Sequence, residues 1–236
     1  MKLATVSCHV ERPLDDRTWA AFSEFQARRP GGFAIAALMR PPDPVESEAL
    51  WLARARIAAT RGPFGHHTHW GGANQARPVD GDPAERVRRE AEWLRDRGLE
   101  PRLFCGGGWY TDEGVAAALA ELGYTDCTAT AFRPDYLEAD APRLELDEPA
   151  WLRLGDARLL ELPATHSLGM AARAGIGRLP AYVHVYFHDT DLLDERRRGA
   201  LTTALRLIGR RRRPTPLDAV SAETETAYSR QMRGVT

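Results

Sequence analysis

The stretch PRLFCGGGWYTDEGVAAALAELGYTDCTAT, residues 101–130, contains one complete strand–helix–strand unit. The apolar run at 101–105 predicts a strand. Residues 111–123 predict a helix, which ends at Gly123 because glycine readily adopts the left-handed conformation of helix ends. The threonine-rich segment 124–130 predicts the next strand. Two strands joined by a helix normally run parallel, so this unit indicates a parallel sheet.

The same alternation extends in both directions along the chain of 236 residues. Further strands are predicted at 2–8, 33–39, 63–69, 157–163 and 180–187, further helices at 15–29, 43–60, 81–98 and 193–209, and an irregular segment at 131–156. About seven strands, the first five separated by helices, are typical of a single α/β domain. The pattern alone permits a barrel or an open doubly wound sheet, but the glycine-rich nucleotide signatures that favour the open sheet are missing. We expect one domain over 1–220 and a polar C-terminal tail over 221–236.

The composition is that of an ordinary globular protein, with 43% apolar and 28% charged residues and a formal net charge of −1. This balance gives no electrostatic reason to expect nucleic acid or a membrane as a partner, and the arginine run at 209–214 is interpreted as the solvated end of a helix. The three cysteines are widely spaced and form no CxxC motif, which predicts reduced thiols. No apolar run is long enough for a signal peptide or a membrane span. We expect a cytoplasmic protein whose oligomeric state the sequence leaves open.

Six of the seven histidines lie at or just after predicted carboxyl ends of strands, the edge where parallel α/β folds build their sites. Other polar residues follow the same strand ends. The whole set consists of His9 and Glu11 after the first strand, His66, His67 and His69 at the third, Gly106 to Tyr110 after the fourth, Arg133 after the fifth, Thr165 and His166 after the sixth, and His188, Asp189 and Asp191 after the seventh. The remaining one, His184, alternates with Tyr182 and Tyr186 and is interpreted as a hydrogen-bonded interior residue. The sequence thus predicts one polar pocket.

The motif HHTHW, which begins at His66, is the clearest indication of a metal site. In an extended strand His67 and His69 point to the same side, about 6–7 Å apart at the backbone, and two neutral imidazoles so placed can bind one zinc-like ion. His66 points to the other side and is interpreted as structural. The third ligand would come from the first strand end, as Glu11 or His9. A salt bridge between Glu11 and a nearby arginine is the alternative.

With these residues in place, the chain resembles the polysaccharide deacetylase family, carbohydrate esterase family 4, along most of its length. Five segments are similar to the motifs of that family, in the same order: TVSCHVE (5–11), FGHHTHW (64–70), LFCGGGWYTDEGVAAALAELGY (103–124), LELPATHS (160–167) and VHVYFHDTDL (183–192). Three positions differ from the family pattern. His9 stands where one variant of the first motif has Asp, Gly71 stands four residues after His67 where a second histidine is usual, and Cys105 is near the place of an arginine.

The resemblance implies a distorted (β/α)7 TIM-like barrel and a divalent ion, usually zinc. It also implies a hydrolase that removes an N-acetyl group from an amino sugar or related carbohydrate, by attack of an activated water on the amide. The implied metal ligands are His67, His69 and Glu11, and Glu11 is a ligand or the base. His188 would be the general acid that protonates the leaving amine, with Asp189 orienting it. Substrate contacts would come from His9, Trp109, Tyr110, Arg133 and His166.

Two other functions fit part of the pattern. A different metal-dependent amidohydrolase barrel also carries an HxH motif, but normally at its first strand rather than its third. A deacetylase-like domain without a metal, which binds a glycan or a protein, would account for the altered first and second motifs. The retention of His67, His69, His188 and Asp189 in one predicted pocket favours catalysis, because a decayed site has no physical reason to keep four polar groups together.

Overall fold

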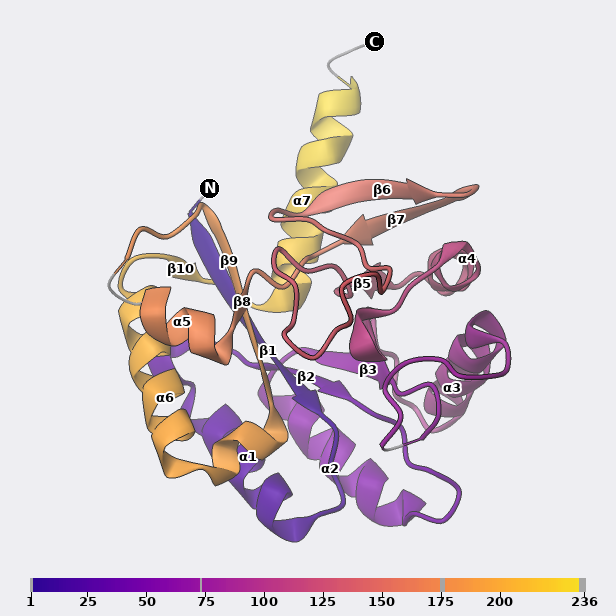
Figure 1. Cartoon of the computed structure of the whole chain (residues 1–236), viewed down its shortest axis with the longest axis horizontal. Helices are drawn as coiled ribbons and strands as arrows, with labels where there is room; N and C mark the ends of the chain where they lie inside the picture. Colours follow the sequence, from indigo (N-terminus) through magenta and orange to yellow (C-terminus); the bar gives the residue numbers. More distant parts are fainter. Residues whose placement is uncertain (1, 73, 175–176, 234–236) are drawn as a thin grey trace.

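The computed structural model describes residues 2–72, 74–174 and 177–233, and a ten-stranded sheet forms the centre of this part of the chain (Figure 1). Its strands are β1 (Leu3–Val10), β2 (Ala36–Met39), β3 (Phe64–Thr68), β4 (Leu103–Gly106), β5 (Thr125–Asp126), β6 (Ala150–Leu154), β7 (Ala157–Glu161), β8 (His166–Ser167), β9 (Tyr182–His188) and β10 (Arg213–Pro214). The order across the sheet is β6-β7-β5-β4-β3-β2-β1-β9-β8, with β10 beside β1. Every neighbouring pair runs parallel except β6 and β7. The prediction of a largely parallel sheet is confirmed.

Seven α-helices lie in the described part of the chain: α1 (Asp16–Arg28), α2 (Glu48–Arg61), α3 (Pro83–Asp96), α4 (Glu113–Leu122), α5 (Leu168–Ala174), α6 (Glu195–Gly209) and α7 (Leu217–Arg233). Five of them begin where the sequence supplies a short polar side chain that accepts a backbone N–H of the first turn. These capping residues are Asp15, Ser47, Asp82, Asp112 and Asp194. The molecule is therefore a mixed α/β fold with a mostly parallel sheet.

Strand alternation divides the buried side chains of β1 between two cores. The even-numbered residues, such as Val6 and Cys8, join an apolar cluster with side chains of α1, α2 and α6, including Phe22 and Leu205. These three helices lie side by side in Figure 1. The odd-numbered residues of β1 point to the other side and become polar toward the carboxyl end of the strand, where Thr5, Ser7 and His9 are all buried. This second face carries the polar residues that matter for function.

The region 124–156 differs from its prediction. The strand expected over 124–130 is regular only at Thr125–Asp126, and the segment 131–156, expected to be irregular, contains β6. Strands β6 and β7 form an antiparallel hairpin in which Leu154 pairs with Ala157. The two residues between them are Gly155, with φ +56°, and Asp156, so a glycine-containing two-residue turn joins the strands. The Gly-Asp turn was the feature of the sequence that could have predicted the hairpin, but the regular alternation of strands and helices elsewhere in the chain drew attention away from it.

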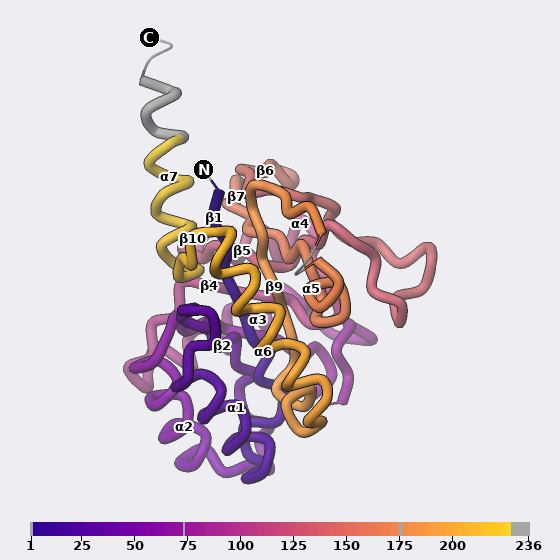
Figure 2. The backbone as a smooth tube through the Cα atoms, turned by 90° about the vertical axis from the view of Figure 1, so that its left-hand side faces the viewer, coloured from indigo at the N-terminus to yellow at the C-terminus, as the bar shows by residue number. Residues whose placement is uncertain are grey.

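Helix α7 occupies the region where a polar tail was expected from residue 221. Its beginning is attached to the sheet, since Val220 is 2% exposed and Ser221 Oγ lies 2.7 Å from Thr125 Oγ1. Figure 2 shows the start of α7 beside β1 and β10. Residues 234–236 lie outside the described residues, and the expected domain range of 1–220 stays a prediction. Helix α5 was also missed, because its seven residues are too few for a clear helical period.

The segment that joins β7 to β8 makes hydrogen bonds to neighbours on both sides. The Ala164 nitrogen donates to the Ala129 oxygen over 2.8 Å, and the next residue, Thr165, donates from its nitrogen to the His184 oxygen over 2.9 Å. These bonds link the β5 side of the sheet with β9. The expected barrel stays a prediction. Within the described residues, no helix has both the length and the apolar character needed to span a bilayer.

Candidate functional site

Glu11, the first residue after β1, lies at the centre of a group of imidazoles. Its Oε1 atom is 3.3 Å from His69 Nε2, 3.4 Å from His188 Nε2 and 3.8 Å from His67 Nε2. The sheet order explains the convergence, because β3 is two strands from β1 on one side and β9 is adjacent on the other. Parallel strands bring their carboxyl ends to one edge. The grouping of these four side chains follows the prediction of one polar pocket.

His67 has the geometry of a metal ligand. Its Nδ1 lies 2.9 Å from the backbone oxygen of Cys105 on the neighbouring strand β4, so Nδ1 carries the proton and Nε2 has a free lone pair. The residue is 1% exposed, and Nε2 is a buried atom without a hydrogen-bond partner among the described residues. A buried polar atom without a partner is uncommon, and a bound metal ion would give this nitrogen one.

Three sets of ligand atoms in the described residues are each close enough together to hold one ion, with all atoms of a set within 4.8 Å of one another. The first set is Glu11, His67 and His69, the second is His9, Glu11 and His188, and the third is His9, His67 and Cys105. The first set is the one expected from the sequence. Imidazole nitrogen and carboxylate oxygen are ordinary zinc ligands.

The electrostatic environment fixes the charge of several of these groups. Burial alone would raise the pKa of Glu11, but contacts with His67 and His69 outweigh it and hold that pKa well below its usual range. Burial lowers the pKa of His67 and, more strongly, that of His9. Glu11 is therefore an ionised carboxylate, and His9 and His67 are neutral imidazoles near pH 7, which are the forms that bind a cation.

The surroundings of His188 favour its protonated form, in contrast to those of His9 and His67. Burial lowers its pKa, but a contact with Asp191 and the nearby Glu11 charge outweigh this and leave the pKa above its ordinary value. Its Nδ1 is 3.8 Å from Asp191 Oδ2, and its backbone nitrogen donates to the same oxygen over 2.9 Å. Asp189, expected to orient the ring, is instead buried and accepts hydrogen bonds from the backbone nitrogens of Arg12 and Thr190. The residue facing the imidazole is Asp191.

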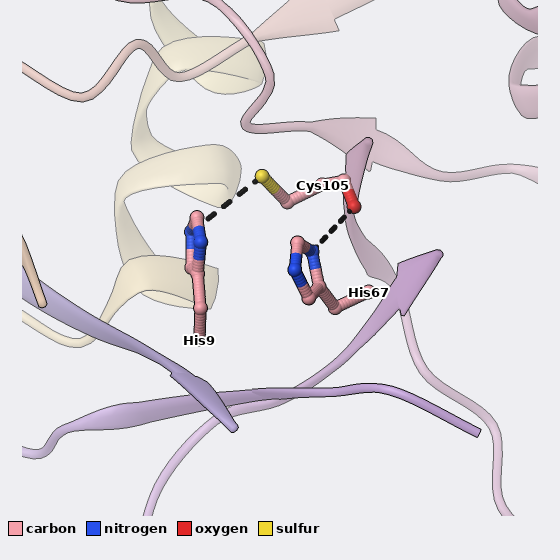
Figure 3. Close-up of side chains that lie close together, drawn as sticks. All are labelled: His9, His67 and Cys105. Carbon is pink, nitrogen blue, oxygen red and sulfur yellow. Dashed lines mark hydrogen bonds between the residues drawn. The ribbon is translucent and has the colours of Figure 1, made fainter. Parts of the chain in front are cut away.

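His9 and Cys105 form a buried pair beside His67 (Figure 3). Cys105 Sγ lies 3.6 Å from His9 Nε2, and the His9 and His67 ring centres are 4.5 Å apart. The Trp109 and Tyr186 rings, each 5.3 Å from the ring of His9, close this group off. The sequence placed His9 among the substrate contacts and gave Cys105 no role, because a thiol without a CxxC partner carries no motif.

The two remaining interior histidines are fully engaged in the structure. His66 Nε2 is 2.8 Å from Glu90 Oε2 and 2.9 Å from Thr68 Oγ1, on the α3 side of β3. His184 Nε2 is 2.8 Å from Ser7 Oγ, and its Nδ1 lies 3.2 Å from the Pro163 oxygen. The interpretation of His184 as a hydrogen-bonded interior residue is confirmed, and the contacts of His66 agree with a structural residue.

The loop after β4 lies against the histidine cluster. Gly107 permits its close approach, because a Cβ there would stand 2.5 Å from the Thr68 oxygen. Trp109 is 2% exposed and has φ +58°, a left-handed conformation that costs a bulky residue on the order of 1 kcal/mol and is held by packing. Tyr110 is half-buried, donates to Asp112 Oδ2 over 2.5 Å and has the Arg77 guanidinium over its ring.

A cavity of about 580 Å³ opens beside His188. Its walls come from 132–136, 167–170, Arg173, 186–188, Asp191 and Arg197. Among the predicted substrate contacts, Arg133 lines this cavity, and its guanidinium donates to backbone oxygens of Glu138 and Ala141. His166 is half-buried, with Nδ1 2.8 Å from Thr165 Oγ1, and belongs to none of the three ligand sets found in the described residues. The parallel rings of Phe132 and Tyr186, 5.9 Å apart, are lining residues that the sequence analysis missed.

No protein-family model matches the chain, and no curated protein matches it. Among solved structures, it is similar to the 4-alpha-glucanotransferase from Thermococcus litoralis, with a TM-score of 0.55 and 14% identity over 94% of this chain and 38% of that chain. A family 4 carbohydrate esterase from Streptomyces lividans, in complex with acetate, gives a TM-score of 0.48 and 10% identity over 89% and 86% of the two chains. The chain thus spans well under half of the glucanotransferase, and that likeness concerns the fold alone.

Proposed function

We propose that this protein is a hydrolase that uses a divalent metal ion, zinc in the first instance, to remove an N-acyl group such as acetyl from an amino sugar or a related carbohydrate. The observation that carries the proposal is the convergence of two histidines and one carboxylate, Glu11, His67 and His69, around the unpartnered Nε2 of His67. The motif resemblance supplies the reaction class. The glucanotransferase likeness concerns the fold, so the carbohydrate substrate rests on the motif resemblance.

The donor set fits a zinc-like ion. In a tetrahedral site with bonds of about 2.0–2.1 Å, neighbouring nitrogen and oxygen ligands stand about 3.4 Å apart. The separations of Glu11 Oε1 from the two Nε2 atoms, 3.3 Å to His69 and 3.8 Å to His67, are near that value. A bound ion supplies Lewis-acid chemistry, polarising the amide carbonyl and acidifying a water.

The chain's own residues supply the proton transfers. Ionised Glu11 accepts the proton of the attacking water, either directly or while acting as a ligand. His188 holds a proton at an imidazole nitrogen facing the site and donates it to the leaving amine as the C–N bond breaks. Asp191 keeps that ring oriented and favours its protonated form. The cavity beside His188 receives the sugar, with Phe132 and Tyr186 as apolar walls for a sugar face.

The remaining predictions belong to the same proposal. Of the proposed substrate contacts, Arg133 lines the cavity, whereas His9 and Trp109 are buried and would act by shaping the pocket. Tyr110 and His166 do not line this cavity and stay proposed substrate contacts. The hydrogen bonds on both sides of the 162–165 segment favour the (β/α)7 barrel. Cytoplasmic location and a carbohydrate or small-amide partner remain proposals.

The first test is elemental analysis of the purified, tag-free protein beside the double variant His67→Ala/His69→Ala. We expect about one equivalent of zinc or another transition metal per chain, lost in the double variant and retained in the control His166→Ala, whose ring lies outside the ligand sets. Release of acetate from N-acetylated amino sugars is then measured for all three proteins. Absence of metal after reconstitution, with unchanged far-UV circular dichroism, would overturn the proposal and favour the binding-domain alternative.

A further inference from the structure

A second position for a metal ion lies deeper than the one used above. Its ligand atoms are the nitrogens of His9 and His67 and the sulfur of Cys105, which all lie within 4.8 Å of one another. His9, His67 and Cys105 are 4%, 1% and 0% exposed, so the position is more enclosed than that of Glu11, whose side chain is 27% exposed. Figure 3 shows the two imidazoles and the thiol directed toward a common point.

The distance between Cys105 and His9 suits a thiolate-containing metal site. With metal–sulfur and metal–nitrogen bonds of about 2.3 and 2.0–2.1 Å, sulfur and nitrogen ligands of a tetrahedral ion stand about 3.6 Å apart. Cys105 Sγ and His9 Nε2 are separated by 3.6 Å. A thiol-to-imidazole hydrogen bond has a similar length, and a metal ion would replace that bond without moving the two side chains apart.

The state of His67 supports a metal ion at either position, because both positions use the same nitrogen of this residue. Its Nδ1 is engaged by the backbone oxygen of Cys105, and its buried Nε2 has no hydrogen-bond partner among the described residues. In the parallel register of β3 and β4, His67 is paired directly with Cys105. The pairing of the two strands therefore holds the thiol and the imidazole next to each other. An unpartnered nitrogen next to a thiol and a second neutral imidazole is the ligand arrangement that soft ions prefer.

We infer that this chain has an inner metal position, formed by His9, His67 and the Cys105 thiolate, that takes a soft divalent cation. It is separate from the outer position of Glu11, His67 and His69. His67 has only one free nitrogen, so a single ion occupies either the inner or the outer position. The outer position is the one used in the proposed function, and binding at the inner position does not depend on that function.

The two positions differ in the ions that they select and in the part played by Glu11. The inner set has one sulfur, two nitrogens and no carboxylate, whereas the outer set has an oxygen ligand and no sulfur. Thiolate therefore favours cadmium at the inner position more strongly than at the outer one, whereas zinc and cobalt accept both sets of ligand atoms. An ion there would be held by three side chains that are each at most 4% exposed, and Glu11, the proposed base, is not among its ligands. We expect inner occupancy to be a resting state without hydrolytic activity.

Binding at the inner position has a defined proton balance. In the metal-free protein Cys105 is a buried free thiol. Formation of the sulfur–metal bond breaks the S–H bond, and the proton passes to solvent because both imidazoles serve as ligands. No oxidant or reductant takes part. The bound form therefore has a thiolate–metal bond that the outer position cannot produce.

Cobalt(II) is the probe that reports this bond. The full-length, tag-free protein is titrated with Co²⁺ under reducing, metal-free conditions, and bound cobalt is measured by equilibrium dialysis in parallel with the absorption spectrum. We expect about one bound equivalent, accompanied by the sulfur-to-cobalt charge-transfer band in the near ultraviolet. Cys105→Ala should lose the band, and Cys105→Ser serves as a second variant if the alanine protein does not fold.

The other two buried cysteines provide matched controls. Cys8→Ala and Cys127→Ala each remove a buried free thiol outside the ligand sets found in the described residues and should keep the band. Glu11→Gln should also keep it while losing hydrolysis, because only the outer position uses that carboxylate.

Each remaining outcome has a definite meaning. Cobalt bound by the wild type without the band would overturn the inner position and leave the outer position and the proposed function standing. A band that persists in both Cys105 variants, or that disappears in Glu11→Gln, would also overturn the inner position. Absence of bound cobalt in every protein would overturn both proposals.

Discussion

His66 and His67 are neighbours in sequence, yet they point to opposite sides of β3 and differ in how their ring nitrogens are hydrogen-bonded. His66 faces α3, where Glu90 and Thr68 satisfy its Nε2. His67 faces the carboxyl-end pocket, where Nδ1 is fixed by a backbone oxygen and Nε2 has no hydrogen-bond partner among the described residues. Both rings are almost completely buried. Burial therefore does not distinguish a structural histidine from a candidate ligand, but hydrogen-bond satisfaction does.

The largest expected effect comes from exchanging the two histidines separately for alanine. His67→Ala should lower kcat/KM roughly 10³-fold or more, because the ion loses a ligand common to both metal positions, and should leave the fold intact. His66→Ala should retain metal and lose stability. Metal content, acetate release and urea unfolding measured on both variants check this. Equal loss of metal in the two would remove the distinction between the faces of β3.

Glu90 tests the structural side of the comparison. Its carboxylate accepts hydrogen bonds from His66, Thr68 and the Arg86 guanidinium. Burial alone would raise the pKa of Glu90, but the contact with His66 outweighs it and keeps the pKa below its ordinary value. Glu90→Ala should lower the free energy of unfolding by about 2–4 kcal/mol, because it leaves buried partners unpaired. Metal stoichiometry should not change. Urea denaturation and elemental analysis give the two readouts, and a metal loss without destabilisation would contradict the assignment.

A buried pair of acidic residues shows a second reason for which a buried polar atom can have no hydrogen-bond partner. Asp126 and Glu161 are register partners on β5 and β7, and each has one buried oxygen without a hydrogen-bond partner among the described residues. Asp126 accepts from the Thr128 nitrogen, and Glu161 accepts from the Ala129 nitrogen. Burial raises the pKa of Asp126 to about 6 and that of Glu161 well above its ordinary value. We expect the two carboxyl groups to share a proton, which would give these two oxygens a partner.

The sign of the pH effect follows from these raised values. Because the folded pKa exceeds the unfolded one, the contribution to stability is complete below about pH 4 and is lost as pH rises through the folded pKa of about 6. Asp126→Asn keeps the acceptor for Thr128 and removes one titrating group. Relative to this variant, the wild type should lose on the order of 2–3 kcal/mol between pH 4 and pH 8. Parallel unfolding curves at several pH values measure the difference, and identical pH dependence of the two proteins would rule out the shared proton.

The smallest expected effect concerns the orientation of His188. Asp191 raises the pKa of that imidazole, so Asp191→Asn should lower it. A general acid must be protonated, and the alkaline limb of the kcat/KM profile should therefore move to lower pH while the metal content stays the same. Asp189→Asn is the control variant, because Asp189 accepts hydrogen bonds from backbone nitrogens rather than from the imidazole ring. A larger alkaline shift in Asp189→Asn would return the orienting role to Asp189.

Local patterns determined most of the fold. Helical periods, the helix-ending Gly123 and β-type runs located five of the seven helices of the described residues and the parallel strands that carry the site. Strand β6 and helix α5 escaped detection because short elements have weak periods, and α7 escaped because its polar sequence gave no sign of the contact between Ser221 and Thr125. Such contacts join residues far apart in the sequence.

For the site, the sequence by itself determined which residues gather at one end of the sheet, since a strand of known direction places its carboxyl end without further information. It also assigned His66 and His67 to opposite faces, because side chains alternate along an extended chain. Only the tertiary structure decided which neighbours each side chain contacts. Asp191 rather than Asp189 faces His188, and Cys105 lies beside His9, because those distances depend on packing between strands β1, β4 and β9. Spacing along one strand carries no information about the loop or strand that packs across from it.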